Sequence, residues 1–250
     1  MSQSLFQNIL VVDSKDKISG TPNKFIVKFN PLAHVEKIAL EKIVIPFTWY
    51  QITAFNNAIR FNDGTQRDVV IPVGVYSPST LVTAIKTAMD ASPSALVFTV
   101  TFDDTTKKIT IAETGGPTVF SLQFNIPNSI GPILGYENND FTGSATYTAS
   151  NILNLSYNNS FVNVYSKVLN RHDRPIHSSD FKGQFLKVTN NFTTWGGIID
   201  EENLKDIVLA YDPGSTLDKI DLELTDPQDN PIDFNGVDGV LLYMKVYTRI

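Results

Sequence analysis

The stretch from Lys24 to Asp63 decides the fold, and it reads KFIVKFNPLAHVEKIALEKIVIPFTWYQITAFNNAIRFND. Its first part alternates so that three apolar side chains share one face of a strand, namely Phe25, Val27 and Phe29. Asn30-Pro31 predicts a break after this strand. A second strand ends in the apolar block Ile43-Val44-Ile45, which is typical of a strand end buried on both faces. We therefore expect two strands here, the second of which stops at Pro46.

Aromatic residues crowd the segment that follows Pro46 and leads to the turn dipeptide Asn56-Asn57. Such density beside a turn indicates either a plug of the hydrophobic core or an anchor of a subunit interface. The residues alone leave both interpretations open. The candidate interface residues are Phe47, Trp49, Tyr50, Asn56 and Asn57.

The composition narrows the class of protein. The chain has 250 residues, which suits one all-β domain or two small domains, and a hydrophobic content of 42% is enough for a core. A formal net charge of -6 argues against a nucleic-acid-binding protein, which needs a basic surface. Because the chain contains no Cys, disulfides, thiol catalysis and zinc–thiolate sites are excluded. We find neither a signal peptide nor an apolar run of the ~20 residues that span a membrane.

The rest of the chain reads mainly as short strands separated by turns, with about ten strand-like runs. One segment has helical spacing instead, since Ser77 can cap a helix that begins at Pro78 and carries an apolar stripe from Leu81 to Met89. This pattern predicts an all-β fold, a single jelly-roll sandwich or barrel with one short helix inserted.

The first 23 residues hold a short apolar run, Ile9 to Val12, among polar residues. It can form an edge strand, or it can belong to an arm that becomes ordered only on a partner. We favour the arm, and so expect an N-terminal arm of residues 1–23 followed by a jelly-roll domain of residues 24–250.

No pattern points to an active site, a metal or a cofactor. His172 and His177 are five residues apart, which matches no common metal signature. The acidic loop from Asp226 to Asp233 lacks the Gly and Glu of an EF-hand and reads as a turn between strands. Nucleophile-elbow, Walker and dinucleotide-binding motifs are missing. We therefore expect no catalytic residues, no metal and no cofactor, although the two carboxylates of a glycosidase leave little trace in a sequence.

Several separate motifs resemble the penton and minor capsid proteins of virophages and nucleocytoplasmic large DNA viruses. In that group, an Ile-Pro element, a Tyr-x-Ile element and an Asn-Asn pair follow one another. This chain has the first at Ile45-Pro46 and the second at Tyr50-Gln51-Ile52, followed by Asn56-Asn57. Further likenesses are Ile71-Pro72-Val73-Gly74-Val75-Tyr76-Ser77, Leu134-Gly135-Tyr136, and the closing hairpin formed by Ile220 to Asp226 and Asn230 to Gly236.

The resemblance covers Lys24 to Tyr136 and Asp218 to Tyr247. It implies a structural, non-enzymatic capsid protein of a double-stranded DNA virus. More narrowly, it implies a jelly-roll penton that forms homopentamers at icosahedral vertices. Its expected neighbours are major capsid proteins and minor capsid proteins, with no direct nucleic-acid contact. Its expected location is the virion, assembled in the host cytoplasm or viral factory.

Three alternatives stay open from the sequence. The chain can be a minor capsid protein beneath the shell. It can be a carbohydrate-binding sandwich, such as a fibre head or lectin, in which Trp195-Gly196-Gly197 stacks on a sugar. It can also be a glycoside hydrolase, which would need two carboxylates that face each other across a cleft.

Overall fold

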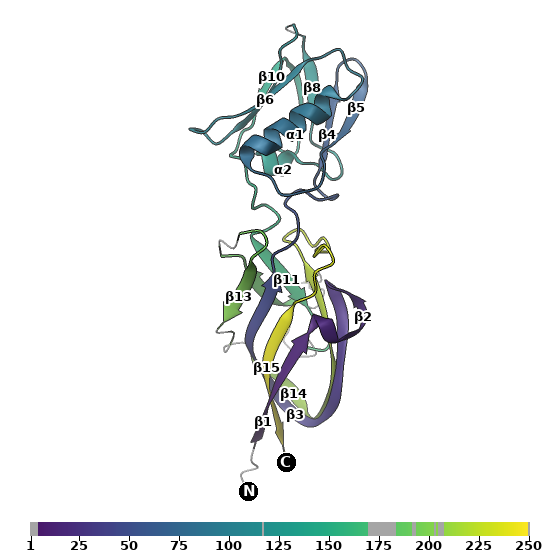
Figure 1. The fold of residues 1–250 in the computed structure, drawn as a ribbon, viewed down its shortest axis with the longest axis vertical. Coiled ribbons are helices and arrows are strands. Elements are labelled where there is room, and N and C mark those ends of the chain that lie inside the picture. The colour runs from purple at the N-terminus through teal and green to yellow at the C-terminus, as the bar shows by residue number, and fades with distance from the viewer. Residues whose placement is uncertain are drawn as a thin grey trace. The chain divides into compact units, whose positions relative to one another are not determined.

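The computed structural model describes residues 5–116, 118–169, 184–191, 194–202, 204 and 208–249. The chain forms two compact units, which we call unit 1 (Met1–Trp49 and Ser160–Ile250) and unit 2 (Tyr50–Asn159) (Figure 1). Strands in antiparallel sheets dominate both units, so the all-β class predicted from the sequence is confirmed. No helix among the described residues is long and apolar enough to span a membrane.

Unit 1 is built on one sheet of eight strands, in the order β1-β15-β3-β14-β11-β12, with β2 and β13 also paired to β3. A single 3-10 turn, Ser14–Asp16, separates the first two strands. The strands are β1 (Leu5–Asp13), β2 (Lys17–Thr21), β3 (Lys24–Pro46), β11 (Phe161–Tyr165), β12 (Gln184–Thr189), β13 (Ile198–Glu202), β14 (Val208–Thr225) and β15 (Leu241–Arg249).

Strand β3 is the longest strand of unit 1, and it differs from what the sequence predicts. The expected break at Asn30-Pro31 is wrong, because β3 runs through it as a strand of 23 residues. Pro31 cannot donate a ladder hydrogen bond, but β14 pairs irregularly here, with register shifts on both sides of Leu217. His34 has a positive φ of 53°, which marks a local bend.

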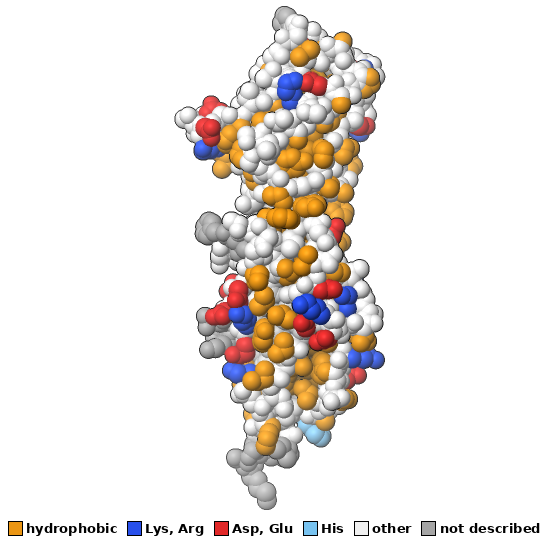
Figure 2. Space-filling model, viewed as in Figure 1, with side chains coloured by type: hydrophobic (Ala, Val, Ile, Leu, Met, Phe, Trp, Pro, Cys, Tyr) orange, Lys and Arg blue, Asp and Glu red, His pale blue; other side chains and the backbone are white. Residues whose placement is uncertain are grey.

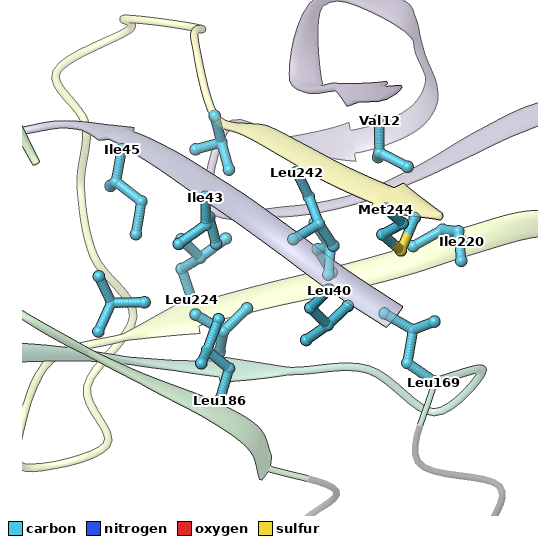
Figure 3. Packing of buried hydrophobic residues seen from close by; sticks show 14 of the residues in the cluster. Val12, Leu40, Ile43, Ile45, Leu169, Leu186, Ile220, Leu224, Leu242 and Met244 are labelled. Atoms are coloured by element: carbon cyan, nitrogen blue, oxygen red, sulfur yellow. The ribbon is translucent and has the colours of Figure 1, made fainter. Parts of the chain in front are cut away.

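The two halves of β3 have different neighbours. The first half pairs with β2, from Lys24 to Val27, and the second half pairs with β15 and ends against β13, whereas β14 pairs with both halves, from Lys24 to Ala39. Both halves contribute to one buried cluster, with Phe25 and Val27 from the first half and Leu40 and Ile43 from the second. Figure 3 shows the residues of this cluster interdigitating between strands. The sheet therefore closes over its own apolar face.

The N-terminal residues 5–21 are part of unit 1. All nine residues of β1 pair antiparallel with β15, from Leu5 opposite Arg249 to Asp13 opposite Leu241. Val12 is fully buried, and Ser14 accepts the backbone N–H groups of Gly239 and Val240. Residues 5–13 therefore form an edge strand, one of the two interpretations that the sequence leaves open, and the role of residues 1–23 as an arm stays a prediction.

Unit 2 contains two small antiparallel sheets and a helix. Its four-stranded sheet has the order β5-β4-β8-β9 and its three-stranded sheet the order β10-β7-β6. The elements are β4 (Ala58–Asn62), β5 (Gln66–Val70), α1 (Pro78–Asp90), β6 (Phe98–Phe102), β7 (Ile109–Glu113), β8 (Phe120–Gln123), α2 (Gly131–Leu134), β9 (Asp140–Ser144) and β10 (Thr146–Thr148).

Helix α1 begins where the sequence predicts. The Ser77 hydroxyl accepts the N–H of Thr80, and the Thr80 hydroxyl accepts the N–H of Ser77, which completes a capping box. The helix buries Leu81, Ile85 and Met89 on one face. The single turn of α2 is an addition to the one helix that the sequence predicts.

The core of unit 2 is rich in aromatic rings that meet edge to face. Phe98 lies between Phe61 and Phe120, with centroid distances of 4.9 and 5.4 Å, and Phe120 continues to Tyr147 at 5.1 Å. All four residues belong to a buried cluster whose members come entirely from residues 52–149. Residues 50–159 thus form a body with its own core, inside the range 24–250 that the sequence reads as one domain.

Candidate functional site

The aromatic segment after Pro46 packs inside unit 1. Phe47 and Trp49 are 5% and 2% exposed, and their rings meet at 4.6 Å between centroids. Trp49 also meets Phe234 edge to face at 5.7 Å. Both of these candidate interface residues therefore pack in the hydrophobic core of unit 1.

Thr48, between Phe47 and Trp49 in the sequence, forms hydrogen bonds with two neighbouring loops. Its hydroxyl donates to the carbonyl of Phe234 at 2.9 Å, and its own carbonyl accepts from the Trp195 indole N–H at 3.2 Å. The backbone of Phe47 pairs with Gly196 and Gly197, as Phe47 N–H donates to Gly197 and Gly196 N–H donates to Phe47. The Trp195 loop is therefore held by hydrogen bonds, while the Trp195 side chain stays 48% exposed.

The other three candidate interface residues belong to unit 2. Asn56 and Asn57 are buried, and Tyr50 is half-buried. Asn56 accepts the N–H of Thr53 at 2.7 Å and donates to the carbonyl of Gln51 at 3.1 Å. Both asparagines therefore have structural hydrogen bonds, and a subunit-interface role for the five residues stays a prediction.

Three of the motifs that carry the capsid resemblance meet in unit 2. The Asn57 side chain and backbone bracket Ile71, donating to its carbonyl at 2.9 Å and accepting its N–H at 2.8 Å. Ile52 and Gly74 exchange two backbone hydrogen bonds, at 3.1 and 2.9 Å. The Gln51 side chain accepts the N–H of Tyr76 at 2.8 Å. The Tyr-x-Ile, Asn-Asn and Ile-Pro-x-Gly-x-Tyr motifs thus form one hydrogen-bonded frame, which we call the motif frame.

The Leu134-Gly135-Tyr136 motif also has a structural role, in the close packing of unit 2. Gly135 has φ +84°, and a Cβ atom there would lie 2.3 Å from the carbonyl oxygen of Asn151. The Tyr136 hydroxyl donates to the carbonyl of Tyr147 at 2.7 Å and is close to that of Ile109, at 3.3 Å. Burial raises the pKa of Tyr136 well above its usual value, so this hydroxyl remains a donor.

The acidic loop after Thr225 is a turn, as the sequence predicts. Asp226 accepts the backbone N–H groups of Gln228 and Asn230, both at 2.8 Å, and burial raises its pKa. Asp229 accepts the hydroxyl protons of Tyr165 and Thr225. Within the described ranges, no group of three or more His, Cys, Asp or Glu could hold a metal ion. His172 and His177 lie outside the described residues.

An open pocket of 660 Å³ lies in unit 1, between β2, the start of β3, residues 165–168 and the end of β14. Asp221 and Glu223 both line it. Asp221 accepts from Ser166 Oγ and from two backbone N–H groups, at 2.9–3.1 Å, and Glu223 pairs with Lys24 at 2.8 Å. The two carboxylates leave one strand two residues apart, so they share a wall of the pocket instead of facing each other as a glycosidase pair does.

No family model matches this chain, and no curated protein matches its sequence. Among solved structures, the chain is similar to the crystal structure of the selenomethionine-labelled mavirus penton protein, with 12% sequence identity and a TM-score of 0.45. The similarity covers 99% of this chain and 100% of that chain.

Proposed function

We propose that this chain is a structural capsid protein of a double-stranded DNA virus. More narrowly, we propose that it forms the homopentameric penton at the vertices of an icosahedral shell, beside major and minor capsid proteins. In such a ring each subunit presents two different flanks, and the contacts close when the rotation per subunit is one fifth of a turn. The proposed location is the virion, after assembly in the host cytoplasm or viral factory.

The motif frame is the observation that carries this proposal. Motifs that resemble the capsid group lie up to 25 residues apart in the sequence, yet Gln51 and Tyr76 are joined directly. These motifs are joined by hydrogen bonds in one network, which is compatible with a structural role for them in a shell subunit.

A subunit contact near the motif frame would involve residues that are exposed there. Four of the five candidate interface residues are buried within the chain, which leaves the half-buried Tyr50. Phe55, between Tyr50 and Asn56 in the sequence, is 46% exposed, and Val73 beside Gly74 is 50% exposed. We therefore extend the proposed interface to Phe55 and Val73, because exposed apolar side chains contribute most when a partner covers them.

The test is assembly with shell proteins. The chain is co-expressed with the major capsid protein of its virus, and the particles are imaged by electron cryo-microscopy. We expect density for five copies at each five-fold vertex, and vertex occupancy that falls in Phe55→Glu. Trp195→Glu is the matched control, since Trp195 is similarly exposed, at 48%, but belongs to unit 1. A chain that never enters particles would contradict the capsid role, and density beneath the shell would favour a minor capsid protein.

Carbohydrate binding is a second candidate, favoured by the Trp195 loop. The indole N–H is bonded to the carbonyl of Thr48, which fixes the ring while almost half of the side chain stays exposed. A fixed, exposed ring is suited to stacking on a sugar. Glycan-array binding that disappears in Trp195→Ala and persists in Phe55→Ala would support this function, and an array without signal would exclude it.

A further inference from the structure

Strand β1 ends the large sheet of unit 1, and its outer edge is open. Its nine residues pair with β15 without any shift of register, so the edge is regular from Leu5 to Asp13. In the described part of the chain, no strand pairs with the other side of β1. A regular edge presents a row of backbone N–H and C=O groups to any extended segment that approaches.

This edge lacks the features that usually protect such strands. Residues 5–12 include no charged residue, no Pro and no Gly, whereas natural edges are commonly blocked by charges, Pro or a bulge. Four of its apolar side chains are widely exposed: Leu5 by 49%, Phe6 by 57%, Ile9 by 73% and Val11 by 43%. Figure 2 shows hydrophobic side chains in a band over β15 and β1. Both the backbone edge and the apolar band are suited to a partner strand.

We propose that β1 pairs antiparallel with β1 of a second copy of this chain, about a two-fold axis at Asn8. In this register, Leu5 lies opposite Val11 of the partner subunit, and Phe6 lies opposite Leu10 of the partner subunit. The strand is self-complementary, because apolar residues meet at both ends, Gln7 lies opposite Ile9 of the partner subunit, and the two copies of Asn8 meet on the axis. In this register the residue numbers of each opposite pair add up to 16, so an odd-numbered residue always lies opposite an odd-numbered one. Because side chains alternate between the two faces of a strand, the outward faces of both copies continue into one surface.

The charges beside the edge are compatible with a second copy. On β15, Lys245 pairs with Glu41 at 3.0 Å and Arg249 pairs with Glu36 at 2.9 Å. Asp13 falls beyond the seven-residue overlap from Leu5 to Val11. Two copies therefore meet without unpaired like charges, which is why a second copy of this chain is the occupant that we assign to this edge.

The proposed dimer is independent of the capsid role. It concerns the chain free in solution, and its two-fold contact is isologous, whereas the contacts within a ring are heterologous. The full chain is measured by analytical ultracentrifugation over a range of concentrations, without shell proteins. We expect a reversible monomer–dimer equilibrium.

Charge substitutions test the register. Val11→Lys and Leu5→Glu each place a charge opposite an apolar side chain, so each is expected to raise the dimer Kd by about tenfold or more. The double variant Leu5→Glu/Val11→Lys places opposite charges face to face at both ends, and dimerisation is expected to return with a dependence on salt. Val70→Lys, on strand β5 of unit 2 and 64% exposed, is the matched control and leaves the equilibrium unchanged.

A cross-link gives an independent readout. Because the chain has no Cys, Asn8→Cys introduces one thiol per chain, and directly opposite Cα atoms lie about 4.5–5.5 Å apart, within disulfide range. Oxidation is expected to give a covalent dimer for Asn8→Cys and little for Ile9→Cys, whose Cα atoms lie on the diagonal, about 7–8 Å apart. Near-wild-type circular dichroism of each variant shows that it folds. A wild-type chain that is monomeric throughout, an oligomer that Val11→Lys leaves intact, or equal cross-linking at both positions would each overturn the proposal.

Discussion

Unit 1 and unit 2 bury comparable clusters of apolar residues by different routes. Unit 1 joins two distant parts of the chain, since β3 from the first 49 residues pairs with β13, β14 and β15 from the last 91. Unit 2 is one continuous segment, and its core comes from residues that are close in sequence. Local contacts form with a smaller loss of chain entropy than distant ones. The difference indicates that unit 2 can fold by itself, whereas each half of unit 1 depends on the other.

Expressing parts of the chain separately tests this comparison, and we expect it to give the largest effect. Expressed alone, residues 50–159 are expected to fold, with a cooperative thermal transition and the helical signal of α1 in circular dichroism. Residues 160–250 alone are expected to remain unfolded, because β13, β14 and β15 lose β3, the strand with which all three pair. If residues 50–159 are unfolded as well, the two units are one cooperative body and the comparison fails.

Phe98→Ala tests whether the cores are separate. Phe98 is fully buried among aromatic rings, so its truncation is expected to destabilise unit 2 by about 3–5 kcal/mol. Hydrogen exchange measured by mass spectrometry would show faster exchange in residues 50–159. Tryptophan fluorescence reports on unit 1, because both tryptophans, Trp49 and Trp195, belong to it. That transition should stay in place, and a parallel shift in the fluorescence would contradict separate cores.

Gly135→Ala distinguishes close packing from backbone strain in unit 2. At φ +84° any L-residue costs about 1–2 kcal/mol, and the overlap of Cβ with the Asn151 carbonyl adds about 1–3 kcal/mol. Gly143→Ala is the control, since Gly143 has a similar φ of +79° but no atom within 4 Å of the added Cβ. Urea denaturation should therefore show a larger loss for Gly135→Ala. Equal losses would mean that strain alone accounts for both.

The pH dependence of unit 1 is the smallest expected effect. Burial, followed by the hydrogen bond to Asp229, raises the pKa of Tyr165 to about 12. The protonated phenol is thus favoured in the folded state, so its contribution is present below the ordinary value of about 10 and is lost as pH rises to about 12. Tyr165→Phe should flatten this loss in denaturation followed by tryptophan fluorescence. Tyr76→Phe, in unit 2, should leave the unit 1 curve unchanged; identical curves for wild type and Tyr165→Phe would contradict the assignment.

The sequence predicts local structure best where local chemistry decides it. The capping box of Ser77 and the turn at Asp226 both follow from side chains that hydrogen-bond within a few residues. Asn30-Pro31 misleads, because tertiary pairing carries β3 through a turn signal. The N-terminal segment leaves two interpretations open for the same reason, since its pairing partner β15 is more than 200 residues away.

The candidate site was partly visible in the sequence. Aromatic density singles out Phe47 and Trp49, but whether a ring faces a core or a partner depends on Phe234, which no local pattern connects to them. The motif frame was hidden for the same reason, because the pairing of Asn57 with Ile71 is a property of the folded chain. The open edge of β1 could have been suspected from eight residues without a charge, a rare composition for an exposed strand.

The length of β3 has a mechanical consequence. Its 23 residues extend for roughly 75 Å of contour at about 3.3 Å per residue. Along that length the same backbone pairs with β2 at its beginning and with β13 at its end, while β14 and β15 pair with the residues between. A tensile load that pulls β2 and β13 apart is therefore borne by covalent bonds of β3, while the hydrogen bonds between strands bear load only in shear.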